Sequence, residues 1–380
     1  MSQPTDPLAA VTHPDPYPYY AELASHRALQ RVPGLDMWIA ADARTVREVL
    51  SSRLCRVRPA SEPVPAHLRH AASGGLFGSL VRMNDSPHHS DVKRALGTTL
   101  LREIPSFREE SRRWARTLFA EPELSQLPDR ALAMPIFVVA SLLGVPSIEL
   151  ENTREWVDAY VRSVTAPALT QAGSAGAARL MEQLDAARGA AHRTRLLEAF
   201  TEEARRLDCP AELLTPNAVG LLTQTYEATA GLIGCTLLAL ARSPGLCAQA
   251  VSGDTQLEDI VREAARHDAP VQNTRRFVAE TGMIADQVVE RGETILVLLA
   301  AANRDPQVNP SPEEFIATRP DRCLFTFGVG AHACPGEALA VTLASAAVER
   351  VLETGVDLMP LTKGITYRPS MNARVLGGVP

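Results

Sequence analysis

The sequence predicts a mainly α-helical protein with small β-sheets, and three observations lead to this fold class. Helical spacing of apolar residues dominates residues 87–205. Residues 213–241 carry a single charged side chain, Glu227, and are long enough for a helix buried in the core. Short strand-like runs lie only towards the two ends of the chain, at residues 37–40, 276–278 and 294–299.

The first half of the chain begins with a strand at residues 37–40 and a helix that starts at Ala43. Residues 58–79 are rich in Pro, Gly and Ser, which predicts a long loop. Residues 171–193 are rich in small side chains, which favours a mobile pair of helices. Helices in this half are expected to break near Pro105, Pro122, Pro128, Pro146 and residues 172–176.

The second half opens with the long central helix. We expect Thr215 to be its N-cap and Pro216 its first helical residue, where a missing N–H costs nothing. A further helix is predicted at residues 257–266, before the short strands. A meander rich in Pro and Asp follows at residues 305–321, and a final helix runs from Glu337 to about Glu353.

The composition argues against several classes of protein. A formal charge of −6 and only 5% aromatic residues argue against a nucleic-acid partner, which needs surplus cations and stacking side chains. The central apolar stretch has threonines where a membrane span would be most apolar. Six scattered cysteines and the lack of a visible signal peptide indicate reduced thiols. We therefore expect a cytoplasmic protein that binds no membrane.

The segment around Cys334 carries the clearest chemistry: Phe327-Gly-Val-Gly-Ala-His-Ala-Cys-Pro-Gly-Glu-Ala-Leu-Ala340. Gly328 and Gly330 allow a tight turn that approaches a flat ligand closely. Cys334 precedes the final helix, and a helix N-terminus favours the thiolate that ligates a metal. From the residues alone, three readings stay open: a single-thiolate site such as haem, a buried free cysteine, and zinc held by His332 and Cys334.

Residues 327–340 resemble the haem-binding motif of the cytochrome P450 family, and other segments match the family in order. Glu263-Ala-Ala-Arg266 resembles the Glu-x-x-Arg helix of the family, with Arg319 of the meander as the expected third member. Residues 301–306 and both chain ends are also similar. The resemblance implies one P450 domain over residues 1–380, with haem b (iron protoporphyrin IX) between the long central helix and the helix after Cys334.

The resemblance also implies a set of residues that bind the haem. Cys334 is the expected iron ligand. Lys93 stands at a position where the family often has Arg, and its ammonium offers a point charge to a haem carboxylate instead of the planar fork of a guanidinium. Pro335 removes one N–H that would otherwise be available near the sulfur, which predicts a more electron-donating thiolate. The other expected haem-binding residues are Phe327, Gly328 and Gly336 of the loop and His89, Arg276 and His332 at the haem carboxylates.

The central helix departs from the family pattern. Its run reads Gln224-Thr225-Tyr226-Glu227-Ala228-Thr229, so the usual acid is present as Glu227, but Ala228 replaces a threonine whose hydroxyl assists proton delivery in the family. Three readings compete. A substrate hydroxyl or an ordered water replaces the missing group, or Thr225 or Gln224 supplies it from one turn earlier, or the reaction needs no conventional oxygen activation.

The resemblance implies a bacterial-type monooxygenase that inserts one atom of O2 into a small organic substrate. Electrons would come from a separate ferredoxin and ferredoxin reductase, docked near Lys93, Arg94 and Arg102. Expected substrate contacts include Phe77, Asn273 and Thr274. The alternatives are a P450-fold enzyme for a peroxide-driven, coupling, rearrangement or dehydration reaction, and a haem-based sensor.

Overall fold

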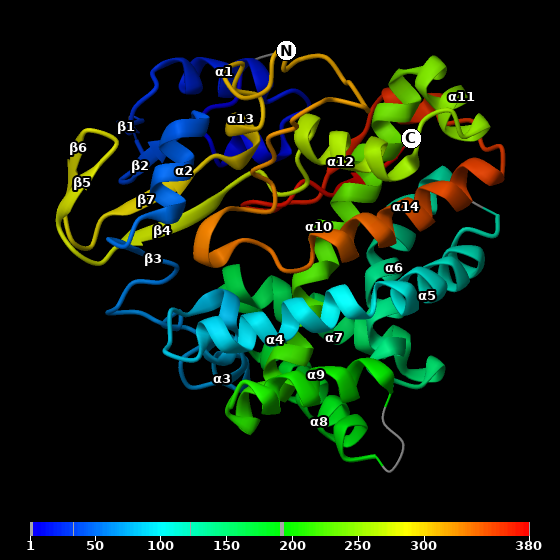
Figure 1. Ribbon diagram of the computed structural model, residues 1–380, viewed down its shortest axis with the longest axis horizontal. Coiled ribbons are helices and arrows are strands. Elements are labelled where there is room, and N and C mark those ends of the chain that lie inside the picture. The colour runs from blue at the N-terminus through cyan, green and yellow to red at the C-terminus, as the bar shows by residue number, and fades with distance from the viewer. Residues whose placement is uncertain (1–2, 33, 122, 191–193, 380) are drawn as a thin grey trace.

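The computed structural model describes residues 3–32, 34–121, 123–190 and 194–379 (Figure 1). Its helices are α1 (Tyr17–Ser25), α2 (Ala43–Ser51), α3 (Ala72–Ser79), α4 (His89–Arg102), α5 (Ile104–Leu118), α6 (Leu127–Leu142), α7 (Leu150–Thr165), α8 (Thr170–Gly189), α9 (Arg195–Arg206), α10 (Leu214–Arg242), α11 (Pro244–Ser252), α12 (Leu257–His267), α13 (Leu299–Ala302) and α14 (Glu337–Glu353). Its strands are β1 (Gln30–Arg31), β2 (Trp38–Ala40), β3 (Cys55–Arg56), β4 (Thr274–Val278), β5 (Gly282–Ile284), β6 (Gln287–Val289), β7 (Thr294–Val297), β8 (Thr366–Tyr367) and β9 (Leu376–Gly378).

The mainly helical fold with small sheets is confirmed. The largest sheet has the strand order β1-β2-β7-β4-β3, in which only the β2–β7 pair is parallel. It joins segments from both ends of the chain and lies to one side of the helices, while α10 runs through the middle of the molecule (Figure 1). The helix α10 packs against α6, α12 and α14, so its long apolar stretch forms the centre of the core.

The final helix has the predicted bounds, but the start of the central helix is different. The helix α10 begins at Leu214, directly after a 3₁₀ turn at Ala211–Leu213. Thr215 is therefore already helical, and its hydroxyl donates to Asp185 Oδ1 at 2.5 Å instead of capping the helix. The predicted N-cap at Thr215 is wrong because a tertiary contact with α8 engages its side chain.

Two loop predictions are wrong for a related reason. The predicted break at residues 172–176 lies within the continuous helix α8, where a Cβ on Gly173 would stand 2.0 Å from Ser163 Oγ and one on Gly176 would stand 2.6 Å from Trp156 O. These glycines let α8 approach α7 closely. The predicted loop at residues 58–79 likewise ends in the helix α3, which packs on α8. Pro122 and residues 191–193 lie outside the described residues.

A buried cluster of charges joins α12 to the meander that follows α13. Glu263 Oε1 accepts from Arg266 Nη2 at 2.7 Å and pairs with Arg319 Nε at 3.2 Å. Arg322 Nε completes the cluster, 2.9 Å from Glu263 Oε2. Burial alone would raise the pKa of Glu263, but the arginines lower it below its usual value. Because Arg266 also donates to the carbonyls of Pro312 and Glu314, the cluster fixes the path of the meander.

Among the described residues, no single helix has the length and apolarity to span a membrane. Only the pair Ala211–Arg242 and Pro244–Ser252 reaches such values together, and that pair is bent by 111°.

The Glu263 cluster gives a first prediction. Glu263→Gln should lower the free energy of unfolding by about 3–5 kcal/mol, because it leaves buried guanidinium groups without their counter-charge. The loss should shrink at low pH, since a carboxyl with a lowered folded pKa stabilises above its unfolded pKa and loses that effect as pH falls through the folded pKa.

Urea unfolding at several pH values measures this effect. Glu258→Gln, in the first turn of the same helix, is the matched control and should cost less than about 1 kcal/mol. Equal losses in the two variants would contradict the structural role of the cluster.

Candidate functional site

The loop before α14 positions the thiol of Cys334. Gly328 and Gly330 have φ angles of +68° and +74°, which side chains with a Cβ rarely adopt, so the turn depends on glycine. The N–H of Cys334 donates to Phe327 O at 2.7 Å and closes the loop. The helix α4 packs beneath it, since a Cβ on Gly97 would lie 3.5 Å from Pro335 Cβ. The loop therefore holds Cys334 at a fixed place just before α14.

Solvent reaches the Cys334 thiol, although protein surrounds it. Burial raises its pKa, and the N–H of Gly336, which donates to Sγ at 3.3 Å, works against that rise. Burial therefore acts against the thiolate, while the N–H of Gly336 favours it. The N–H of Gly336 also means that a donor to the sulfur remains one residue beyond Pro335.

Three of the predicted haem-carboxylate residues gather beside this loop. His332 Nε2 lies 2.8 Å from Asp85 Oδ1, and the His332 and His89 rings are 4.2 Å apart. Burial, with help from the charges of His332 and Lys93, lowers the pKa of His89 to about 4. The ammonium of Lys93 donates to the carbonyl of Ala331 in the same loop. The structure thus brings His89, Lys93 and His332 together next to Cys334.

Arg276 approaches from the sheet. It lies on β4 and is buried, and its guanidinium donates to the carbonyl of Arg275 at 2.9 Å. The charge of Arg82, a residue that the sequence reasoning did not single out, contributes to lowering the pKa of Arg276 after burial. Arg82 lies shortly before His89 in the sequence, and a cation at that place was the signal that could have identified it.

The polar residues expected on the central helix differ in burial and in hydrogen bonding. Thr225 donates its hydroxyl to Leu221 O at 2.7 Å, and Gln224 is half-buried. Thr229 is buried, and its hydroxyl has no hydrogen-bond partner among the described residues. Ala228 is half-buried and contributes no polar group. Burial raises the pKa of Glu227, with Arg368 opposing and Asp158 adding to the rise.

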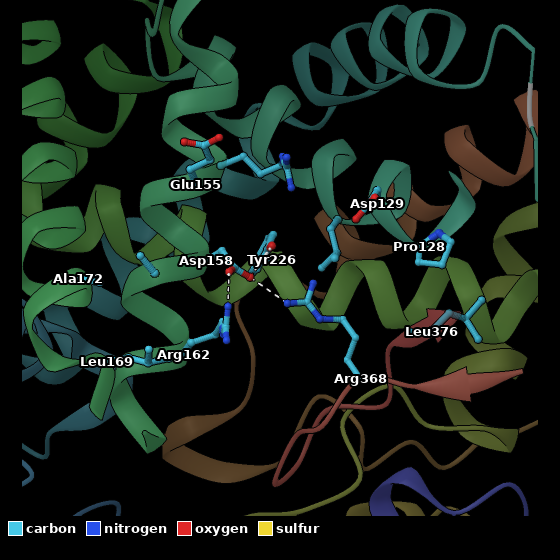
Figure 2. Close-up of a pocket in the computed structure, with 14 residues that line it drawn as sticks. Pro128, Asp129, Glu155, Asp158, Arg162, Leu169, Ala172, Tyr226, Arg368 and Leu376 are labelled. Atoms are coloured by element: carbon cyan, nitrogen blue, oxygen red, sulfur yellow. Dashed lines mark hydrogen bonds and ion pairs between the residues drawn. The ribbon is translucent and has the colours of Figure 1, made fainter. Parts of the chain in front are cut away.

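Asp158 lies at the centre of a polar cluster that the sequence did not predict. Figure 2 shows Asp158 on α7 between Arg162 and Arg368, whose guanidinium groups lie 3.5 Å and 2.9 Å from its carboxylate. The hydroxyl of Tyr226 on α10 donates to the same carboxylate at 3.0 Å. These residues line a cavity of about 490 Å³ next to the helix that carries Glu227.

Two of the three residues expected to contact the substrate are buried in the structure. Phe77 is buried on α3, and the Arg58 guanidinium stands 5.6 Å from the centre of its ring. Asn273 is buried, and its amide donates to the carbonyl of Met371 at 2.9 Å. Thr274 is half-buried at the start of β4. Of these three residues, Thr274 is therefore the most accessible to a ligand.

The residues around Cys334 fit a haem. The thiol of Cys334 is solvent-accessible, and Gly336 leaves the space beside it free of a side chain, since a Cβ at Gly336 would lie in van der Waals contact with Cys334 Sγ at 3.7 Å. Cationic Arg276 and Arg82 and neutral His89 can receive two carboxylates. In the part of the chain that the structure describes, no three His, Cys, Asp or Glu residues are grouped to hold a metal ion. The zinc reading thus finds no ligand set there.

Comparisons with known proteins agree with this geometry. A family model described as Cytochrome P450 matches residues 241–355. The cytochrome P450 monooxygenase PikC of Streptomyces venezuelae is 29% identical over 96% of this chain and 90% of its own length. Cytochrome P450 107B1 of Saccharopolyspora erythraea is also 29% identical, over 87% and 84% of the two chains.

Solved structures extend the similarity over the whole fold. The ligand-free P450 monooxygenase TamI has a TM-score of 0.82 and 26% identity, covering 100% of this chain and 93% of its own. Epothilone B-bound P450epoK has a TM-score of 0.85 at 20% identity, covering 100% and 98%, so it supports the fold alone.

The thiol site gives a second prediction. The dithionite-reduced protein with carbon monoxide should show the strongly red-shifted Soret band of a thiolate-bound haem, and Cys334→Ser should lose that band. Cys323→Ser, which changes a cysteine of the preceding segment, should keep it. A red-shifted band that survives in Cys334→Ser would exclude Cys334 as the iron ligand.

Proposed function

Because the chain belongs to the cytochrome P450 family and is a monooxygenase of that family, we propose that it inserts one atom of O2 into a small organic substrate. The observation that carries this proposal is the accessible Cys334 thiol, held by a glycine-dependent loop and surrounded by groups suited to two carboxylates. The described chain acts in this proposal as one catalytic domain.

The cofactor of this proposal is haem b. Cys334 would bind the iron, Phe327, Gly328 and Gly336 would lie against the ring, and His89, Lys93, Arg276 and His332 would bind its carboxylates. When bound, the haem supplies the redox-active iron at which O2 is activated, and thiolate donation favours cleavage of the O–O bond. The protein supplies orientation, exclusion of water and protons.

Proton delivery is assigned to Glu227 and an ordered water. The hydroxyl of Thr225 already donates a hydrogen bond to the Leu221 carbonyl, so it is a poor donor to a ligand. Ala228 has no hydrogen-bonding group, so a water or a substrate hydroxyl must take the place of the usual threonine. Glu227 has a raised pKa and thus retains its proton to higher pH than an ordinary glutamate, as a general acid requires.

The Asp158 cluster is assigned as the route from solvent to Glu227. Asp158 and Arg368 are close enough to Glu227 to shift its pKa, and they border the cavity shown in Figure 2. A carboxylate bridged to arginine and tyrosine can relay a proton when its hydrogen bonds rearrange. In this proposal a proton passes from the cavity through Asp158 to Glu227, the neighbour of Tyr226 on α10.

Electrons are assigned to a separate acidic ferredoxin with its reductase. The three docking residues expected from the sequence are engaged, since Arg94 pairs with Asp91 and Arg102 with Glu202, and Lys93 donates to the Ala331 carbonyl. A second row of basic residues lies on α5, which packs on α14, the helix after Cys334. Arg108, Arg112 and Arg116 are exposed along one face of α5, and of these Arg112 pairs with Glu349 of α14 at 3.6 Å. We place the acidic partner on this face.

A third prediction tests the acid. Glu227→Gln should lower product formed per electron consumed by about 100-fold, because an amide cannot donate a proton and return it. Coupled turnover of the unchanged protein should fall as pH rises through the raised pKa of Glu227, and the variant should lack that limb. Product, oxygen and reductant are measured together. Glu155→Gln, which lines the cavity beside Asp158 and Arg368, is the matched control, and an equal loss there would remove Glu227 from the pathway.

Ala228 favours one second candidate, peroxide-driven turnover, and a fourth prediction separates the two. With ferredoxin, its reductase and O2, the protein should form product, and Ala228→Thr should raise the yield per electron because it adds a hydroxyl at the site. Turnover with hydrogen peroxide alone, and none with electrons and O2, would replace the proposed function with the second candidate. Ligand binding without product under either supply would indicate a haem-based sensor.

A further inference from the structure

The cavity beside Asp158 is lined by charges of both signs. Its volume of about 490 Å³ lies within the range of roughly 300–1,000 Å³ that is typical of small-molecule sites. Its walls come from segments far apart in the chain: the start of α6, one face of α7, the central helix α10 and the strand β9 (Figure 2). The charged residues of the lining are three arginines and three carboxylates: Arg154, Arg162, Arg368, Asp129, Glu155 and Asp158.

Two of the arginines share a single carboxylate. Arg368 Nη2 lies 2.9 Å from Asp158 Oδ1, and Arg162 Nη1 lies 3.5 Å from Asp158 Oδ2. The hydroxyl of Tyr226 donates to Oδ1 as well, at 3.0 Å. This group therefore carries one surplus positive charge. Because a guanidinium has five N–H groups, Arg162 and Arg368 keep donors for a second carboxylate.

The same two arginines are accessible and held in place. The side chain of Arg162 is 57% exposed and that of Arg368 is 26% exposed. The backbone N–H of Arg368 donates to Val375 O at 2.9 Å, which fixes this residue beside β9. Arg162 lies one turn beyond Asp158 on α7, so the two side chains share a helix face. The two guanidinium groups are thus positioned before any ligand binds.

Two of the three carboxylates have no partner of their own. The side chains of Asp129, in the first turn of α6, and Glu155, on α7, make no hydrogen bond or ion pair with another described residue. Arg154 pairs with Glu151, a carboxylate outside the lining, at 2.6 Å. Figure 2 shows Asp129 on α6, apart from the paired arginines. The lining thus combines unpaired negative charge with the surplus positive charge at Asp158.

We propose that this cavity binds a small zwitterion, an α-amino acid with an apolar side chain. The carboxylate of the ligand binds Arg162 and Arg368, and its ammonium group binds Asp129. A lone anion would meet the unpaired carboxylates and a lone cation would meet the surplus guanidinium charge, so a ligand with both charges matches the lining best. The apolar residues available to the ligand side chain are Pro128, Leu132, Leu169, Ala172 and Leu376.

Occupancy of this site should also affect turnover, a consequence that rests on the proposed function. A carboxylate bound to Arg162 and Arg368 stands beside Asp158, the residue assigned to the proton route. It obstructs that route, so product formed per electron should fall as the amino acid saturates the cavity. Binding itself does not depend on the proton route, and the two effects can be measured separately.

Isothermal titration calorimetry of the haem-loaded protein tests the binding. The probes are L-phenylalanine, L-phenylalaninamide, which lacks the carboxylate, and 3-phenylpropionate, which lacks the ammonium group. Imidazole at saturating concentration ligates the iron and keeps the probes out of the haem pocket. L-phenylalanine should bind at least about 10-fold more tightly than either analogue, because each analogue lacks one charged hydrogen-bonding group.

Charge-specific variants assign the two ends of the ligand. Arg162→Gln should weaken binding of L-phenylalanine about 10-fold or more and leave binding of L-phenylalaninamide unchanged. Asp129→Asn should weaken binding of L-phenylalanine similarly and leave binding of 3-phenylpropionate unchanged. Two matched controls should change none of the three affinities: Arg179→Gln, exposed on α8 outside the lining, and Glu198→Gln, exposed in the first turn of α9.

The other outcomes are distinct. No binding of L-phenylalanine, equal affinities for the three probes, or losses unrelated to the charge removed would overturn the site. Binding that disappears when imidazole is present would place the amino acid in the haem pocket and overturn it too. Binding that leaves product per electron unchanged would support the site and contradict the proton route through Asp158. A missing red-shifted carbon monoxide band would contradict the haem of the proposed function and not this site.

Discussion

The Glu263 cluster is the interaction on which the order of the site depends. One buried carboxylate receives three guanidinium groups, from Arg266, Arg319 and Arg322. Each arginine also donates to backbone carbonyls of the meander, at Pro312 and Glu314 for Arg266. The ion pairs and hydrogen bonds of this cluster offset the cost of removing its charges from water, and the bonds to backbone carbonyls fix the path of the meander.

A short chain of polar contacts carries that order to Cys334. Asn303 Oδ1 accepts from the N–H of Phe325 at 2.6 Å, and its amide donates to Thr326 Oγ1 at 2.7 Å. Thr326 in turn donates to Ala265 O of α12 at 2.5 Å. Phe327 then accepts from the N–H of Cys334. The helix that bears Glu263 thus also anchors the segment that delivers the thiol, so stability and cofactor geometry share one support.

The correct predictions from the sequence concern features that depend on local spacing of residues. The helix at Glu337–Glu353 and the pairing of Glu263 with Arg266 follow from helical spacing, which needs no knowledge of the fold. Failures lie where distant segments meet. Gly173 and Gly176 look like helix breakers in sequence, but they serve a contact with α7.

The partners that sequence reasoning missed have the same character. Asp158 and Arg368 form an ion pair although 210 positions separate them, and no local spacing indicates such a contact. Arg322 was missed because the family resemblance supplied only one meander arginine, while Glu263 has a second oxygen to satisfy. Arg82 makes no hydrogen bond or ion pair with the described residues, so no spacing in the sequence could have indicated a role for it.

Charged side chains that support the fold are paired within the protein, whereas some charged side chains around the proposed haem are not. Structural charges are neutralised inside the protein: Arg374 pairs with Asp268 at 2.9 Å and donates to carbonyls near the N-terminus, as Glu263 pairs with its arginines. Among the described residues, Arg276 and Glu227 form no ion pair, and both belong to elements around the proposed haem. A fold that neutralises its other buried ions so thoroughly would gain stability by neutralising these as well. Their retention is best explained by the ligand, whose carboxylates and proton demand complete the charge balance.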